Sequence, residues 1–349
     1  MKKIFVLIML CLCLWCFSEY TVYASAPSDF EYQSDAGVSF RKIYQAILSG
    51  DFGEIKSVLF TCVRQSVFGE IDTYRTTMRH ILIFVVFLAV LTNIGQAFRG
   101  SDVSKTGFLI GYITVISYIL FSFYKISDMG RQILQSSNDF LSAVIPVYAV
   151  SIGIVSKSEA LVFYEIALII VKFSELLFLK LAFPMICFYV CVGLINQLGE
   201  EDYFSKTCGF IKKTLEFSVK FFIGGIVSLN VIQKMIAGSQ GGRIETIIQN
   251  ISKDSSLPIT GLIMGAGKAI RDSLGLAAVI FLLVLILAPV CKALVFVFSY
   301  KLLEAVIQPI SDSRIVSCLE IVAEGGEMIL KILIYNFLML ELTIGIICL

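Results

Sequence analysis

The feature that most constrains the fold of this chain is a run of nineteen uncharged residues, 273–291, with charged residues close to both of its ends. An apolar run of about 20 residues is long enough to cross the hydrocarbon core of a bilayer as a helix. Within lipid, charge and irregular backbone persist only where protein or a water-filled cavity surrounds them. The run and its glycine-rich flank, 257–272, therefore predict a membrane span with a polar feature inside the protein.

The composition of the whole chain agrees with a membrane protein. Of the 349 residues, 57% are apolar and 16% are charged, and the mean hydropathy is +0.87. A soluble domain has roughly 25% charged residues. The net charge of +1 and the lack of a basic patch interleaved with aromatic residues argue against nucleic-acid binding.

The first residues have the pattern of a secretory signal. Lys2 and Lys3 form its charged start, 4–17 its apolar core, and Ala24 ends a small-residue cleavage site. We therefore predict a signal peptide over residues 1–24. The alternative is an uncleaved first membrane helix, for which the apolar core is short.

Residues 25–79 form an exported segment, and residues 80–349 a multi-span membrane domain. In the exported segment, apolar residues recur at helical spacing on both sides of Gly50, which predicts a pair of amphipathic helices. The pair could dock on the membrane face, on a partner or on the protein's own helices.

The expected fold is an all-α polytopic membrane protein with seven or eight spans and a short amphipathic helical segment at its N-terminus. Each predicted span has about the length that crosses roughly 30 Å of hydrocarbon. The distribution of Lys and Arg leaves the orientation open. The spans expected from the apolar runs are 81–98, 106–124, 140–156, 181–199, 217–237, 273–291 and the last run, which ends at Leu349.

Residues 160–198 are too long for one span, because a single helix of this length would measure roughly 58 Å. We therefore expect a tight helical hairpin that turns near 180–184, where Pro184 lies. Lys172 and Glu175 in its first arm are three residues apart and can form an ion pair. A polar connection is expected at 200–216.

The candidate functional residues lie in and around the glycine-rich flank of the 273–291 span. They would belong to a broken or re-entrant helix that lines a polar path. The alternative is that the charges only flank the span at the membrane interface. Lys301 with Glu304, and Glu327 with Lys331, are expected to form structural pairs. The candidates for the helix break or polar path are Gly261, Gly265, Gly267, Lys268, Arg271, Asp272, Pro289, Lys301, Glu304, Pro309 and Asp312.

No catalytic, cofactor-binding or metal-binding motif is evident. Five residues separate Gly261 from the Gly267–Lys268 pair and Ala269 follows, whereas a P-loop needs four residues and then Ser or Thr. His80 is the single histidine, which removes most zinc and haem options. A serine triad would have to use His80, which lies at a membrane boundary, and the chain has no GxSxG elbow. We therefore predict a protein that is not an enzyme and has no cofactor.

Several short motifs give the chain a family likeness. They are LINQL at 194–198, LPITG at 257–261, PVCK at 289–292, YKLLEA at 300–305 and QPISDSR at 308–314. These are packing and turn motifs and not catalytic ones. With these motifs the sequence resembles the stage III sporulation protein AE family over roughly residues 81–349, most strongly after Leu257.

The resemblance implies a place in the mother-cell membrane that surrounds the forespore. It implies a non-enzymatic subunit of a secretion-like channel or feeding complex, required for stage III of sporulation. The implied partners are a partner ATPase, small membrane subunits and ring-forming subunits, together with membrane lipid and, as a further option, other copies of the chain. The alternative function is a self-contained secondary transporter with a polar site at a broken helix near residues 261–272.

Overall fold

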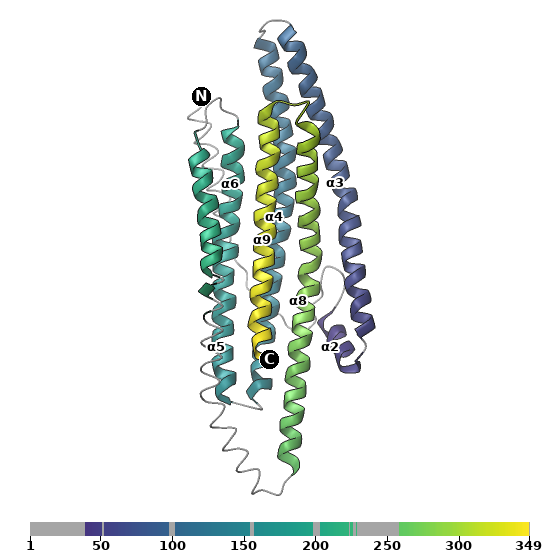
Figure 1. Cartoon of the computed structure of the whole chain (residues 1–349), viewed down its shortest axis with the longest axis vertical. Coiled ribbons are helices and arrows are strands. Elements are labelled where there is room, and N and C mark those ends of the chain that lie inside the picture. Colours follow the sequence, from purple (N-terminus) through teal and green to yellow (C-terminus); the bar gives the residue numbers. More distant parts are fainter. Residues whose placement is uncertain are drawn as a thin grey trace.

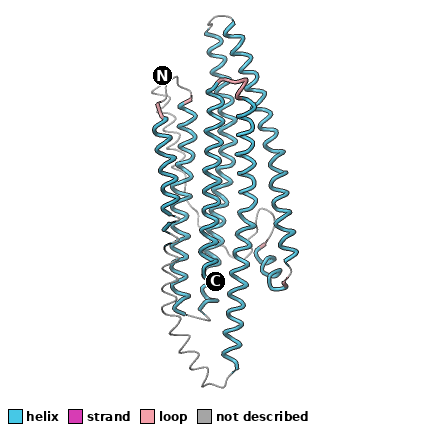
Figure 2. Tube along the Cα trace, viewed as in Figure 1, coloured by secondary structure: helices cyan, strands magenta, loops and turns pink. Residues whose placement is uncertain are grey.

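Most helices of the structure are long and run along one common axis (Figures 1 and 2). It is a computed structural model that describes residues 39–50, 52–97, 102–153, 157–197, 203–222 and 258–348, together with residues 224, 225 and 228. The predicted signal peptide, 1–24, lies outside the described residues.

The first two helices, α2 (Phe40–Ser49) and α3 (Phe52–Ala97), are separated by a glycine turn. Gly50 has a φ of 73°, a left-handed conformation that glycine adopts without steric cost, and its N–H bonds to the carbonyl of Ile47 at 3.2 Å. The second helix of the predicted pair is not a separate element. It continues into the predicted first span, so α3 has 46 residues.

Helix α2 packs against the protein's own bundle. The buried ring of Phe40 lies edge-on to Phe140 of α4 and to Phe281 of α8, with centroid distances of 5.4 and 5.7 Å. Edge-to-face aromatic pairs of this kind add to the free energy gained from apolar burial. Of the three surfaces on which this segment could dock, α2 therefore packs on the protein's own helices.

Helix α4 (Asp102–Gly153) joins two of the predicted spans, 106–124 and 140–156, into one helix of 52 residues. The prediction of a break between them is wrong. The buried side chains of Ile126, Ile133 and Leu134 continue the apolar face at helical spacing through the charged stretch between the two runs. The charges therefore lie on other faces of the same helix and do not end it.

The predicted hairpin near 180–184 is also wrong. Helix α5 (Lys157–Ser174) passes through a π-helical segment, η1 (Glu175–Ala182), directly into α6 (Phe183–Asn196). Proline is tolerated in the first turn of a helix, where its missing N–H has no partner to lose, and Pro184 lies there in α6. The π-helical turns absorb the irregularity without reversing the chain.

Residues 205–222 are helical, so the predicted polar connection at 200–216 is already helix from residue 205. The turn before this helix is held by Asn196, whose side-chain oxygen accepts a hydrogen bond from the Phe204 N–H at 2.9 Å. Near the far end of this helix, the Phe222 ring stacks on the Phe173 ring with 5.0 Å between the ring centroids. It also meets the Phe178 ring edge-on with a centroid distance of 5.4 Å.

Helix α8 (Pro258–Ile307) is continuous, and α9 (Ser313–Cys348) returns beside it. The predicted helix break in the glycine-rich flank is therefore wrong: the backbone is helical from Gly261 through Asp272, and Pro289 lies inside the helix. A glycine within a helix costs about 1 kcal/mol relative to alanine. The packing of α8 along α3, α4 and α9 offsets such a cost.

Helix α9 is central to the bundle and contacts α4, α5, α6 and α8. Gly325 and Gly326 lie inside this helix without interrupting it and allow close packing. A Cβ at Gly325 would lie 2.5 Å from Val190 Cγ2 of α6, and one at Gly326 would lie 2.7 Å from Phe296 Cε1 of α8. These two glycines therefore bring α9 against two neighbours at once.

Four helices in the described part of the chain contain stretches long and apolar enough to cross a membrane. The prediction of seven or eight spans is not confirmed, because single helices contain apolar runs that were predicted to be separate spans. The four stretches are Ile55–Val90, Ile110–Val147, Ala167–Asn196 and Asp272–Ile307.

The close approach at Gly326 leads to a stability prediction. Gly326→Ala should destabilise the bundle by about 1–3 kcal/mol, as overpacking of a tight core does, because the Phe296 ring is buried and held between Tyr74 and Tyr300. Thermal unfolding of the detergent-purified protein, followed by circular dichroism, measures the change.

The matched control is Gly209→Ala, since a Cβ at this exposed helical glycine has no atom within 4 Å. It should leave the unfolding midpoint unchanged or raise it slightly. Equal midpoints for the Gly326 variant and the wild type would contradict the proposed close packing.

Candidate functional site

A cluster of polar side chains lies where α6, helix 205–222, α8 and α9 meet. Its centre is Glu324 of α9, which accepts a hydrogen bond from the Tyr189 hydroxyl of α6 on one carboxylate oxygen. The other oxygen is 2.9 Å from Lys212 Nζ of helix 205–222. One carboxylate therefore links three helices that are far apart in the sequence.

A second ion pair extends this cluster toward α8. Glu327 of α9 pairs with Lys301 of α8. Glu304 and Glu320 add negative charge beside it, since Glu304 interacts electrostatically with both Glu320 and Lys301. The expected pairs within single helices, Lys301 with Glu304 and Glu327 with Lys331, are replaced by one pair between two helices. We call Tyr189, Lys212, Lys301, Glu324 and Glu327 the polar cluster.

The local sequence of α9 explains how this cluster forms. Glu324 and Glu327 stand directly before and after the two glycines that bring α9 close to α6 and α8. Successive residues of a helix are about 100° apart around its axis, so residues three apart differ by roughly 60°. The two carboxylates therefore leave α9 near the points of closest approach, one toward Lys212 and one toward Lys301.

The electrostatic effect of the cluster reaches Cys208, at the start of helix 205–222. Burial raises the pKa of the Cys208 thiol, and the nearby Glu324 carboxylate raises the pKa further. The thiol is therefore protonated at neutral pH, and a reactive thiolate is disfavoured at this position.

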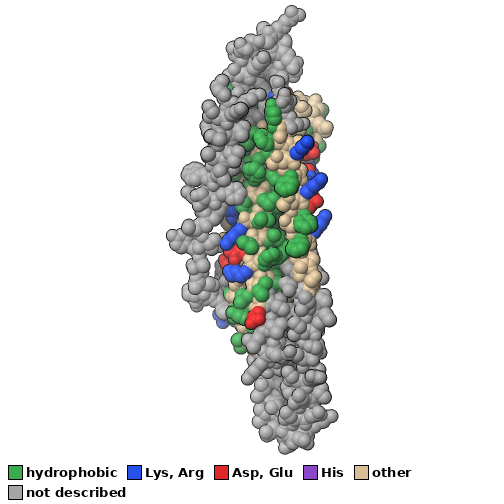
Figure 3. Space-filling model, turned by 90° about the vertical axis from the view of Figure 1, so that its left-hand side faces the viewer, with side chains coloured by type: hydrophobic (Ala, Val, Ile, Leu, Met, Phe, Trp, Pro, Cys, Tyr) green, Lys and Arg blue, Asp and Glu red, His purple; other side chains and the backbone are tan. Residues whose placement is uncertain are grey.

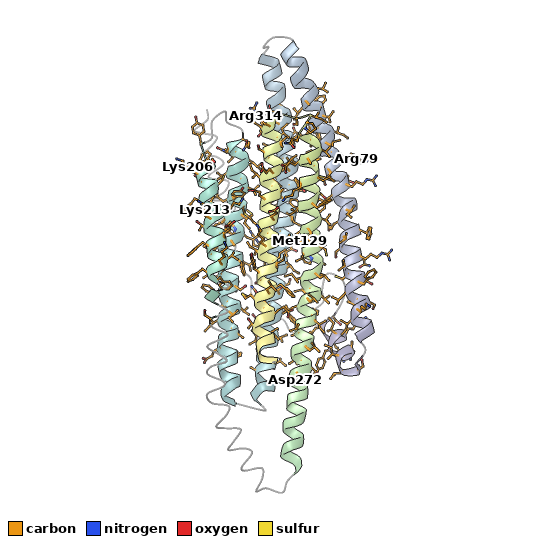
Figure 4. The ribbon with its side chains drawn as sticks, in the orientation of Figure 1. Arg79, Met129, Lys206, Lys213, Asp272 and Arg314 are labelled. Atoms are coloured by element: carbon orange, nitrogen blue, oxygen red, sulfur yellow. The ribbon has the colours of Figure 1, made fainter. Side chains whose placement is uncertain are left out.

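The structure does not bring the predicted site residues together. Asp272 lies in the lower part of α8 (Figure 4). Lys301 and Glu304 lie in the last turns of this helix. The 29 residues from Asp272 to Lys301 correspond to about 44 Å of helix. Gly261, Gly265, Gly267, Lys268 and Arg271 belong to the helical backbone on the Asp272 side, and whether they line a polar path stays a prediction.

The other predicted residues form the turn between α8 and α9. Pro309 follows the end of α8, where proline cannot continue a helix. Asp312 caps α9: its Oδ1 accepts the Arg314 N–H at 2.9 Å, and its carboxylate also pairs with the Arg314 side chain at 3.2 Å.

Sequence reasoning missed Tyr189, which no local pattern distinguishes from the apolar residues around it. It placed Lys212 in a polar connection, gave Glu327 the partner Lys331 of the same helix, and gave Glu324 no partner. The informative signal was the sequence Glu-Gly-Gly-Glu at 324–327 within an apolar helix, because embedded carboxylates require partners. Within the residues that the structure describes, no group of three or more His, Cys, Asp or Glu residues could hold a metal ion.

Comparison with known proteins gives a consistent result. The family model described as stage III sporulation protein AE matches residues 38–349. The chain belongs to this family. It is 22% identical over 296 residues to the stage III sporulation protein AE of Bacillus subtilis (strain 168), an alignment that covers 80% of this chain and 72% of that protein. No solved structure matches the chain.

The match extends the likeness seen in the sequence. As a member of the stage III sporulation protein AE family, the chain has a role in sporulation. The family model begins at residue 38, so it includes α2 and all of α3 in addition to residues 81–349. The polar cluster and the glycines beside it lie well within the matched region.

The ion pair between α8 and α9 can be tested by charge reversal. Lys301→Glu should lower stability by about 1 kcal/mol, since partly exposed pairs contribute about that much at most, and here 55% and 30% of the two side chains are exposed. The double variant Lys301→Glu/Glu327→Lys restores the pair in reverse and should recover most of the loss. Thermal midpoints in detergent measure both effects.

Lys206→Glu is the control, because Lys206 is an exposed lysine near the start of helix 205–222 and has no part in the polar cluster. It should leave the midpoint within error of the wild type. If the thermal midpoint of the double variant falls by the sum of the losses that its two single substitutions cause, Lys301 and Glu327 do not interact.

Proposed function

We propose that the chain is a non-enzymatic integral membrane subunit of a secretion-like sporulation complex between mother cell and forespore. The observation that carries the proposal is the family match over residues 38–349. The four long apolar stretches support membrane insertion. The resemblance to the family is the ground for the complex and for its location in the mother-cell membrane around the forespore.

The outer surface of the bundle suits a protein surrounded by lipid or by other subunits. Large aromatic side chains point outward along α3 and α4, where Phe60, Phe68 and Phe87 are 70%, 64% and 57% exposed and Phe121 is 59% exposed. Exposed apolar surface of this extent marks membrane or protein contacts in folded proteins.

The interior of the bundle suits a packing subunit better than a transporter. The ionisable groups of the polar cluster are matched, with Lys212 against Glu324 and Lys301 against Glu327. A transporter site of the predicted kind would need a broken helix near 261–272, with free backbone groups facing a substrate, but α8 is continuous there. In this proposal the chain is a subunit of the complex, and the energy for transport by the complex comes from a partner ATPase.

Affinity purification and reconstitution separate these functions. A tagged copy, solubilised from sporulating cells after mild cross-linking, should co-purify with an ATPase and with ring-forming subunits, whereas the purified chain alone in liposomes should move no solute. The subunit hypothesis fails if the chain alone transports a solute and Asp272→Asn or Lys268→Ala abolishes that transport. Gly209→Ala serves as the control variant in the liposome assay, since this exposed glycine belongs to helix 205–222 and a Cβ there has no atom within 4 Å.

A further inference from the structure

A groove on the bundle surface lies between α6, helix 205–222 and α9. Its volume is about 240 Å³. Figure 3 shows the side of the bundle that lies on the left in Figure 1, where an apolar strip is bordered by basic and acidic side chains. The groove is lined by Ile186, Leu215, Glu216, Val219, Lys220, Met328, Lys331, Ile332 and Tyr335.

The floor of this groove is apolar. Ile186, Leu215, Val219 and Ile332 are all buried and contribute hydrocarbon surface from three different helices. Tyr335 also lines the groove, and its phenol hydroxyl can donate or accept a hydrogen bond. An occupant of this floor therefore needs an apolar part.

The rim of the groove is charged and has an excess of positive charge. Lys220 and Lys331 are exposed and belong to different helices, and Glu216 is the single acidic residue of the lining. Neither lysine lies within ion-pair distance of a carboxylate in the part of the chain that the structure describes. The two ammonium groups and one carboxylate leave a net charge of +1, which a single negative charge would neutralise.

The groove lies at a boundary along the bundle axis. Lys220 follows Lys212 of the polar cluster by two helical turns, and Lys331 follows Glu327 by one turn. Beyond Lys331, residues 332–340 of α9 contain no charged residue. A charged stretch of α9 therefore ends, and an uncharged stretch begins, at the groove.

We propose that this groove binds an anionic phospholipid. The phosphodiester, with its single negative charge, lies between Lys220 and Lys331, and one acyl chain follows the apolar floor toward residues 332–340. Basic pockets between membrane helices bind anionic headgroups in this way. The volume is smaller than that of a pocket for a drug-sized ligand, roughly 300–1,000 Å³, so the groove holds the headgroup and the first part of one chain.

The same observations disfavour other occupants. A free phosphate ion would leave the apolar floor exposed to water, and a second copy of the chain would bring the same excess of positive charge to the contact. The proposed site does not depend on the role in a sporulation complex, so either hypothesis can fail alone.

Lipid binding to the full-length protein tests the proposal. The protein is purified in detergent, stripped of lipid and titrated with phosphatidylglycerol or phosphatidylcholine of the same acyl chains, and native mass spectrometry counts the bound lipid. We expect phosphatidylglycerol to bind about tenfold more tightly, since each lysine near an anionic headgroup contributes about 1 kcal/mol and Glu216 offsets part of this. Lys220→Gln/Lys331→Gln should remove the preference, and inorganic phosphate should not compete.

Two further variants control for folding and for general surface charge. Glu216→Gln raises the net charge of the groove and should tighten phosphatidylglycerol binding by about threefold. Lys42→Gln/Lys206→Gln removes two exposed lysines outside the groove and should leave the preference unchanged. Equal binding of the two lipids to the wild type, or an unchanged preference in Lys220→Gln/Lys331→Gln, would overturn the proposal.

Discussion

The close approach of α9 to its neighbours at Gly325 and Gly326 is the constraint on which the rest of the bundle depends. A side chain at either position would overlap Val190 of α6 or Phe296 of α8. Because the two glycines face different helices, one short stretch of α9 sets the position of both. The flanking carboxylates of Glu324 and Glu327 then reach Lys212 and Lys301, so close packing and charge pairing are consequences of the same four residues.

The sequence predicted the helical class and the ends of several elements, but it divided the long helices wrongly. Gly50 and Asp312 mark true boundaries, because a left-handed turn and a helix cap are local features that a few residues determine. The breaks expected near Pro184 and in the glycine-rich flank of α8 do not occur. There, packing against neighbouring helices outweighs the local preference of proline and glycine, and a single sequence contains no direct record of that packing.

The candidate site was predictable only in part, for a related reason. Lys301, Glu304, Glu324 and Glu327 stand out in the sequence because charge inside apolar helices needs a partner. The partners themselves depend on tertiary contacts: Glu324 lies 112 residues from Lys212 and 135 residues from Tyr189. Spacing within one helix favoured partners three or four residues away, and the structure instead pairs residues between helices.

The height of the charged residues along the bundle limits how a bilayer could surround it. Gly130 of α4 lies against Ile329 of α9 and Phe183 of α6, so the charged stretches 125–139, 172–180 and 320–331 lie at similar heights. A helix of 52 residues is about 78 Å long, more than twice the roughly 30 Å of a hydrocarbon core. A single bilayer core can therefore cover only one of the two apolar lengths that these charges separate. If the hydrocarbon core surrounded these charged stretches, Lys212, Glu324, Lys301 and Glu327 would have to keep their ion-pair partners. The polar cluster is therefore the part of the structure most sensitive to the position of the membrane.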